Sequence, residues 1–413
     1  MCILLLSSLL FANGLTTHCW ISAHAISLLP DGELKSLLTD PNLELYWRNG
    51  TMFPDGGYPQ GDNYGEMAHW EPFQMAYLEW IKSNYDFPLT NEASQHVAFL
   101  LGMTSHGLAD QTFDSMYMTR AWVYDSSADW SLSMDTATDV IFSSLTGPQP
   151  VPESWIPDDP FVSLFEEQGH LVDISTLENG QNLVRTAVTW VGSAGQTDEL
   201  VDLYEPQFPW ANTNLLSEVI SGAPPVEAQL VAEYWMLLWE RLNEMEQSTD
   251  VIRVFPSETD FSHPLDADSI ESRISIVFAR GLNIDTISEE SFSIQHSDGT
   301  YVPLVIDVYY GMNSHVVHLF PIADFRANSD YIISVDSGIE YFDGMALTEP
   351  QFFNFTTKDP PPVPSNNSKV DERGCNSASS HRSSVWLILV GLLCLRTRRV
   401  LAFLEKKSHL ECS

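Results

Sequence analysis

The sequence predicts a multi-domain chain in which a mainly α-helical domain is followed by an all-β sandwich. Three observations lead to this prediction. The 413 residues exceed the usual size of one domain, and 44% hydrophobic content is enough for ordinary cores. Residues 18–248 are rich in Trp and carry long amphipathic segments, whereas short alternating runs begin near residue 250. We therefore expect the helical domain at 13–248 and the sandwich at 250–358.

Two segments of the first domain show the clearest helical periodicity. Apolar residues recur at a spacing of three to four over Ser94–Met118, as on one face of a helix. Val226–Met245 places Trp235, Leu238 and Leu242 on one side. We expect both segments to form long helices.

The second domain is predicted from alternating apolar runs that are separated by Gly, Asn and Asp turns. About 105 residues of such strands are typical of a β-sandwich. We interpret His315 and His318 as structural, because residues three apart point to different faces of a strand. The expected strands are Arg273–Phe278, Tyr301–Val308, His315–Leu319, Tyr331–Val335 and Phe352–Phe355.

The two ends of the chain carry targeting patterns. Residues 1–12 form a short apolar run that ends in small residues, which predicts a signal peptide. The basic residues that usually precede such a run are missing, so a buried N-terminal helix is the alternative. A Pro/Ser-rich linker is expected at 359–384, followed at 385–413 by a short hydrophobic segment with an Arg cluster.

The C-terminal segment predicts where the protein resides. Its apolar run, Val385–Leu395, is shorter than the ~20 residues of a comfortable membrane span, and Arg396, Arg398 and Arg399 follow it. The order of Cys375, apolar run and Arg cluster resembles the C-terminal sorting signals of some Gram-negative surface proteins. We expect an exported protein, extracellular or at the cell surface of a Gram-negative bacterium, with the tail as a sorting signal or membrane anchor.

The charge balance excludes one class of function. The chain has 56 acidic and 19 basic residues, a formal net charge of −37. Because such a surface repels a polyanion, binding of nucleic acid through a basic patch is not favoured. A solvated exterior is the simplest interpretation of the acids, and affinity for cations is the functional alternative. No disulfide framework is expected from the cysteines, which are Cys2, Cys19, Cys375, Cys394 and Cys412.

Potential metal ligands gather in the first 140 residues. His106, Asp110 and Asp114 are spaced i, i+4, i+8 on a predicted helix, so their side chains share one face. Asp135 and Asp139 repeat the i, i+4 spacing on the next predicted helix. Imidazole and carboxylate are ligands of Zn²⁺, but such pairs are more often surface contacts. Further candidates are His18, Asp55 in a turn, and His69.

Four segments give further support to the interpretation of these residues as metal ligands. They are ThrThrHisCysTrpIleSerAlaHisAlaIle at 16–26, AsnGlyThrMetPheProAspGlyGlyTyrPro at 49–59, AlaHisTrpGluProPhe at 68–73 and AlaPheLeuLeuGlyMetThrSerHisGlyLeuAlaAsp at 98–110. In this order they resemble the zinc-dependent phospholipase C family. The resemblance is stronger to the N-terminal catalytic domain of glycosylphosphatidylinositol-specific phospholipase D, and it covers about 18–145. It implies a helical domain with three zinc ions in a cleft.

The resemblance also implies roles for individual residues. His18 and the N-terminal backbone freed by signal removal would hold one Zn²⁺. His69, His106 and Asp110 would hold a second, with Asp110 bridging the two ions. Asp55 would be a ligand or the base for the attacking water, and is therefore the implied catalytic residue.

The third site departs from the family pattern. Asp114 stands where the phospholipase D form has His, and Ser131 stands where another His is expected. Asp135 and Asp139 match the acidic pair of that form. An all-carboxylate site would favour Ca²⁺, Mg²⁺ or Mn²⁺ over Zn²⁺. The alternative is an empty third site, which leaves a centre of two metals.

The strand region has a resemblance of its own. TyrIleIleSerValAspSerGlyIle at 331–339 and PheAsnPheThrThr at 353–357 resemble a bacterial Ig-like domain. No cluster of catalytic residue types is visible there. Substrate positioning, spacing from the membrane and adhesion are all compatible with such a domain.

The expected function is that of a metal-dependent phosphodiesterase that hydrolyses phospholipids, of phospholipase C or D type. Metal-activated water would attack phosphorus, and the substrate would be a phospholipid or a membrane surface. Two alternatives stay open: a nuclease-type phosphodiesterase of the same fold, and a catalytically degraded surface binding or adhesion protein. An apolar rim for the substrate is predicted from Trp20, Tyr58, Trp70 and Phe73, although core packing would explain these aromatics equally well.

Overall fold

A computed structural model describes residues 14–130, 133–256, 267, 269–309 and 313–357. The predicted signal segment at 1–12, the linker at 359–384 and the tail at 385–413 lie outside the described residues. All described residues belong to one compact unit that extends to Asp359. Among the described helices, none is long and apolar enough to span a membrane.

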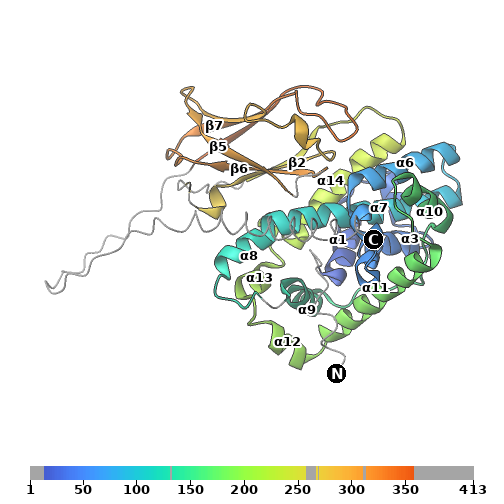
Figure 1. The fold of residues 1–413 in the computed structure, drawn as a ribbon. Coiled ribbons are helices and arrows are strands. Elements are labelled where there is room, and N and C mark those ends of the chain that lie inside the picture. The colour runs from blue at the N-terminus through green and yellow to red at the C-terminus, as the bar shows by residue number, and fades with distance from the viewer. Residues whose placement is uncertain (1–13, 131–132, 257–266, 268, 310–312, 358–413) are drawn as a thin grey trace, which may run out of the picture. The chain divides into compact units, whose positions relative to one another are not determined.

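The first part of the chain is helical, as the sequence predicts (Figure 1). The expected helix over Ser94–Met118 is observed as α7 and a π-helical turn, and Val226–Met245 as α14. The helices are α1 Leu15–Leu28, α2 Glu33–Leu38, α3 Glu44–Met52, η2 Pro54–Gly56, α4 Gly57–Gln60, α5 Tyr64–His69, α6 Glu71–Asn84, α7 Asn91–Thr112, the π-helical η3 Phe113–Met118, α8 Thr119–Tyr124, α9 Met134–Thr146, α10 Asp158–Glu167, α11 Ile174–Ala194, α12 Asp198–Tyr204, α13 Pro209–Asn214 and α14 Pro224–Leu242.

Helix α7 lies at the centre of this region, and α1, α3, α6 and α14 pack against it. Two glycines allow α3 to cross it at very short range. A Cβ atom on Gly50 would lie 2.0 Å from the carbonyl oxygen of Phe99, and one on Gly102 would lie 2.0 Å from that of Trp47. Because no side chain separates the two backbones, the segment that follows α3 is held directly against α7.

The second part of the chain is a sandwich of two four-stranded antiparallel sheets, with strand orders β1-β2-β6-β5 and β4-β3-β7-β8. The expected run Tyr301–Val308 is divided at Pro303 into two strands that belong to different sheets. Alternation did not indicate β1 and β3. The strands are β1 Val251–Phe255, β2 Ile274–Phe278, β3 Phe292–His296, β4 Tyr301–Val302, β5 Leu304–Val308, β6 Val316–Pro321, β7 Asp330–Val335 and β8 Gln351–Thr356.

The sandwich has a core of its own but also shares the core of the helices. Ile276, Phe278, Ile294 and Val335 are among the buried residues between its sheets. Phe255, Val277 and Val316 belong instead to the large cluster of buried residues that includes α6, α7 and α14. Apolar residues of the two regions therefore pack together at their interface.

His315 and His318 are both buried, as expected for structural residues. His318 on β6 is hydrogen-bonded through Nδ1 to the hydroxyl of Ser275, at 2.8 Å. His315 donates from Nδ1 to the carbonyl oxygen of Phe278, at 2.9 Å.

Candidate metal centre

Four side chains from three separate segments converge on one point in the helical region. Asp55 comes from η2, His69 from the last position of α5, and His106 and Asp110 from successive turns of α7. The Nε2 atoms of His69 and His106 are 3.1 Å apart. Oδ1 of Asp55 lies 3.6 Å from each of them, and Oδ2 of Asp110 lies 3.2 Å from His69 and 3.5 Å from His106.

These five separations have the size found in a tetrahedral zinc site, although Asp55 and Asp110 belong to different ligand groups. Ligand atoms that lie ~2.0–2.2 Å from a tetrahedral Zn²⁺ are about 3.3–3.6 Å from one another. The five measured separations of 3.1–3.6 Å agree with this geometry. In addition, Oδ2 of Asp55 is buried and accepts no hydrogen bond from any described residue. The residues present therefore fit a bound divalent cation.

His18 on α1 forms a second group with His106 and Asp110. Its Nε2 atom is 2.8 Å from Oδ1 of Asp110, while Oδ2 of Asp110 faces His69 and His106. The ring of His18 stacks on that of His106, with centroids 3.7 Å apart. The two oxygens of Asp110 thus face different groups of ligands, as a carboxylate that bridges two ions must.

Backbone carbonyls set the orientation of two imidazoles. Nδ1 of His69 donates to the carbonyl oxygen of Gly65 at 2.6 Å, and Nδ1 of His106 donates to that of Thr51 at 2.7 Å. A carbonyl oxygen can only accept, so the Nδ1 atoms carry the protons and the Nε2 lone pairs of the neutral rings point into the site. This is the usual arrangement behind a metal-ligating histidine.

The electrostatics of the centre favour positive charge. Burial would lower the pKa of His106, but Asp55 and Asp110 outweigh it and raise this pKa to about 9. Burial would raise the pKa of Asp110, yet His18 and His106 hold it well below its usual range. His18 differs: burial and the charge of His106 lower its pKa. Two buried carboxylates thus require cationic partners, which protons or a metal ion supply.

Asp139 has a different position from that predicted for a ligand. It is buried on α9, and its oxygens accept from the backbone N–H groups of Thr16 and Thr17 and from both hydroxyls, at 2.5–3.1 Å. These N–H groups lie in the first turn of α1, which has no partner for them within the helix. A Cβ on Gly14 would lie 2.0 Å from Cβ of Asp139. Asp139 therefore anchors the start of α1, one turn before His18.

The other two predicted acids lie outside the two ligand groups found among the described residues. Asp135 is buried on α9, and burial together with the charges of Asp114 and Asp110 raises its pKa well above its usual range. Asp114, in the π-helical turn, accepts a hydrogen bond at 2.7 Å from the hydroxyl of Tyr309 in the sandwich. That Asp114 and Asp135 form a third metal site stays a prediction.

The four residues of the predicted aromatic rim differ in their burial and in their neighbours. Tyr58 lies beside the site, with its ring 5.4 Å from that of His69 and its hydroxyl donating to Glu66 at 3.1 Å. Trp70 is partly buried and also donates to Glu66, at 2.9 Å. Trp20 is partly buried and stacks on His24. The expectation for Phe73 is wrong, because this side chain is 1% exposed and so cannot form a rim.

Phe73 is a core residue for a clear physical reason. Its ring stacks on that of Phe165 with centroids 4.0 Å apart and meets Phe161 edge to face at 5.2 Å. An aromatic side chain enclosed in this way stabilises α6 against α10 and has no surface left for a substrate.

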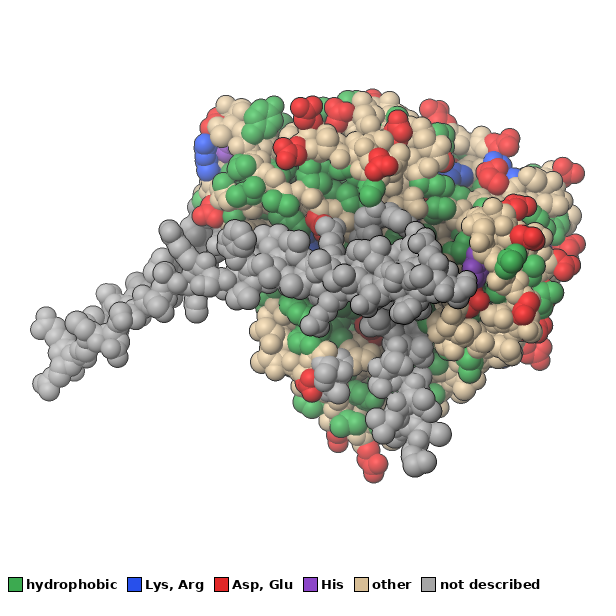
Figure 2. All heavy atoms as spheres, in the orientation of Figure 1, with side chains coloured by type: hydrophobic (Ala, Val, Ile, Leu, Met, Phe, Trp, Pro, Cys, Tyr) green, Lys and Arg blue, Asp and Glu red, His purple; other side chains and the backbone are tan. Residues whose placement is uncertain are grey.

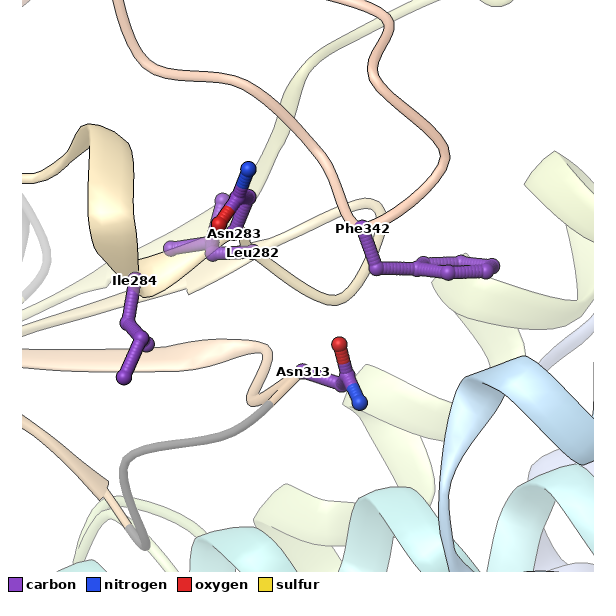
Figure 3. A pocket seen from close by; sticks show the side chains of 5 residues that line it. All are labelled: Leu282, Asn283, Ile284, Asn313 and Phe342. Carbon is purple, nitrogen blue, oxygen red and sulfur yellow. The ribbon is translucent and has the colours of Figure 1, made fainter.

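Two surface features lie apart from the ligand groups. A small pocket in the sandwich is lined by Leu282, Asn283, Ile284, Asn313 and Phe342 (Figure 3), and none of these side chains is ionisable. Acidic side chains are spread over the described surface seen in Figure 2 and do not gather in one patch. This distribution agrees with a solvated acidic exterior.

Residue spacing did not indicate the supporting shell of the site. The carbonyls of Thr51 and Gly65 are backbone groups, so no side-chain pattern marks them. Gln111 and Tyr309 contact partners about 200 positions away in the chain, at His315 and Asp114 respectively. For Gln111 the one available signal is its place directly after Asp110 in the sequence.

A family model described as a bacterial Ig-like domain matches residues 250–357. This match and the two antiparallel sheets confirm the predicted fold, a helical region followed by an all-β Ig-like domain.

Curated relatives match part of the chain. It is 28% identical over 206 residues to the phosphatidylinositol-glycan-specific phospholipase D of Rattus norvegicus, which covers 40% of this chain and 24% of the relative. The enzyme of the same name from Mus musculus is 33% identical over 142 residues, which covers 31% of this chain and 17% of the relative. The chain thus spans less than a quarter of the length of these relatives. The part of the resemblance that concerns this phospholipase is supported, whereas a wider relation to zinc phospholipase C stays a prediction.

A solved structure, the N-terminal part of the bacterial S-layer protein SbsC, also aligns with the chain. It is 13% identical with a TM-score of 0.22, and covers 72% of this chain and 79% of its own. A score this low does not indicate a shared fold.

Proposed function

We propose that this chain is an exported, metal-dependent phosphodiesterase that hydrolyses phospholipids. The observation that carries the proposal is the convergence of the Asp55 and Asp110 carboxylates on the Nε2 atoms of His69 and His106, at 3.2–3.6 Å, in a chain similar to phospholipases D. Zinc is the proposed ion, since two imidazoles and two carboxylates form a typical zinc ligand set.

The residues would act as follows. His69 and His106 present Nε2 lone pairs, with both rings held by backbone carbonyls, so the site is organised before any ligand binds. Asp110 presents one oxygen to each ligand group. A bound divalent ion supplies a Lewis acid for the phosphate oxygens and lowers the pKa of a bound water. Asp55 is proposed as a ligand or as the base that accepts the proton of that water.

The proposed reaction is hydrolysis of one phosphate ester bond. A water oxygen bonds to phosphorus, the bond from phosphorus to the leaving alcohol oxygen breaks, and that oxygen takes up a proton. The cationic centre would offset the repulsion between an acidic protein and an anionic phosphodiester. Tyr58, whose ring contacts that of His69, and Trp70, which shares the partner Glu66 with Tyr58, are the rim residues for which this proposal retains a substrate contact.

A membrane or phospholipid surface is the proposed partner, and export with retention at the cell surface is the proposed location. Both rest on sequence patterns at 1–12 and 385–413, outside the described residues. Removal of the signal would also free the backbone that precedes α1, close to His18.

The decisive experiment combines metal content with product identification. Protein that begins at Asn13 is analysed by elemental mass spectrometry and then incubated with phosphatidylcholine and with a phosphatidylinositol-glycan substrate. Phosphatidic acid as product indicates D-type cleavage, and diacylglycerol indicates C-type cleavage. Turnover of single-stranded DNA alone would instead support the nuclease, and absence of bound metal would support a surface binding protein.

A further inference from the structure

The sandwich contacts Asp114, one of the acids of the predicted third metal site. Tyr309 directly follows strand β5, and its hydroxyl donates to Oδ2 of Asp114 at 2.7 Å. The side chain of Tyr309 packs against the apolar core that the helices and the sandwich share. Its position is therefore determined by packing as well as by the hydrogen bond.

The same domain holds α7 at the position next to Asp110. Oε1 of Gln111 accepts from the backbone N–H of His315 at 2.8 Å and from the hydroxyl of Ser314 at 3.2 Å. Gln111 is buried, so these contacts are shielded from water. Two points on one helix, at 111 and 114, are thus tied to the sandwich immediately after the ligand Asp110.

A third tie lies next to His69. Glu71 at the start of α6 is fully buried, and its carboxylate accepts from the backbone N–H of Gly281 in the sandwich. The same carboxylate pairs with Arg241 of α14 at 2.6 Å. Arg241 in turn donates to the carbonyl oxygen of Ala279. The segments that carry His69 and Asp110 are therefore both fastened to the sandwich by buried polar contacts.

The position of Asp114 gives these contacts a consequence for metal binding. Asp114 follows Asp110 by four residues on the continuous helix formed by α7 and η3, so its backbone lies about one turn beyond that ligand. The hydroxyl of Tyr309 fixes the direction of one oxygen of Asp114 by its hydrogen bond to that oxygen.

We propose that the Ig-like domain completes the metal centre, and that Tyr309 is a positioning residue that orients Asp114 for a divalent cation. The proposal rests on the metal centre of the proposed function. It predicts that a sandwich residue controls metal affinity in the helical region, which a domain serving only as a spacer or adhesion module would not do.

The test uses the full chain from Asn13 and a titration of chelated protein with Zn²⁺ or Mn²⁺ against a chromophoric chelator. Tyr309→Phe removes only the hydroxyl, and we expect the affinity for at least one ion to fall by about 10–100-fold. The matched control is Tyr301→Phe, which removes a hydroxyl from a side chain 65% exposed on β4 of the same domain. The control should bind as the unaltered chain does.

A double-mutant cycle with Asp114→Ala tests whether Tyr309 affects metal affinity through Asp114. If Tyr309 acts through Asp114, its substitution adds no further loss of affinity in the Asp114→Ala background. An equal loss in both backgrounds would overturn the proposal, as would unchanged affinity in Tyr309→Phe. A fall of all metal affinities together with a lower Tm of the chelated protein would indicate a structural role and also overturn it. If the unaltered chain binds no metal, the proposed metal centre itself fails.

Discussion

The Nε2 atoms of His69 and His106 lie 3.1 Å apart, and each ring donates its Nδ1 proton to a backbone carbonyl. In their neutral forms the two rings would therefore direct lone pairs at one another. Such an arrangement is unfavourable unless a positive charge lies between them, either a proton or a metal ion. The buried carboxylates of Asp55 and Asp110 lie beside the two rings and further increase the need for a positive charge there.

We predict that removal of metal destabilises the protein. An ion that binds only the folded state adds about 2.7 kcal/mol to the free energy of unfolding at one hundred times its Kd. Chelated protein should therefore unfold at a lower temperature than protein as purified, and added Zn²⁺ should restore the difference. Scanning fluorimetry and elemental analysis measure both effects. An unchanged Tm after chelation, with no metal found, would contradict the prediction.

Asp55→Asn should abolish most turnover while leaving the fold intact. The substitution keeps the size of the side chain but removes its charge, so a ligand or general base is lost. We expect kcat to fall by about 10²–10⁴-fold. The control is Asp62→Asn in the following loop, whose partner is His170 at 2.6 Å. Turnover retained by Asp55→Asn would contradict its assignment.

Asp139→Ala separates an anchoring role from the ligand role that the sequence predicts. Loss of the carboxylate leaves the N–H groups of Thr16 and Thr17 buried without acceptors, which should cost about 1–3 kcal/mol in the free energy of unfolding. The loss should appear in urea unfolding of chelated protein, where metal plays no part. Asp173→Ala, which removes an exposed cap from α11, is the control and should cost less. Loss of metal without loss of chelated stability would instead support a ligand.

Periodicity and composition predict the architecture of this chain well, because the relevant signals are local. The apolar spacing in 94–118 and 226–245 indicates helices, and the alternation after 250 indicates strands. Strand β3 was missed because Phe292–His296 offers only a short alternation between acidic and turn-forming neighbours. The division of the run 301–308 at Pro303 arises because its two halves join different sheets, and tertiary packing determines which sheet a strand joins.

The ligand groups were predictable to a different extent. His106 and Asp110 follow from the period of one helix, but their meeting with Asp55, His69 and His18 required a family resemblance, because spacing along the chain does not determine tertiary contacts. Their equal spacing predicts the same role for Asp135 and Asp139. Their environments differ, because of these two only Asp139 accepts hydrogen bonds from the first turn of α1. Contacts from the sandwich to the centre depend on how the domains pack.

Arg241→Ala should destabilise the junction of helices and sandwich. Its partner Glu71 is 0% exposed, and a buried carboxylate that loses its guanidinium typically costs about 3–5 kcal/mol. Urea unfolding measures the effect. The control is Arg253→Ala, whose partner Glu233 is more exposed, so that pair should contribute less than about 1 kcal/mol. Equal effects of the two substitutions would show that the buried pair has no special weight.

His318 should make the sandwich sensitive to acid. Burial, with the nearby charges of Arg273 and Arg120, holds the pKa of His318 well below its usual range. Asp307, its cross-strand partner on β5, is the acidic residue in register with it. Below the ordinary histidine pKa of about 6.5 the unfolded chain binds a proton that the folded chain does not, so stability falls as pH decreases.

His318→Gln removes this titration and retains a polar group for Ser275. The free energy of unfolding should therefore decline less steeply between pH 7 and pH 5 in the variant, by at most about 1.4 kcal/mol per pH unit. Urea unfolding of chelated protein at several pH values measures the two slopes without a contribution from metal binding. Identical slopes would mean that the folded protein accommodates a charged imidazole at this position, and that Asp307 offsets burial and the two arginines.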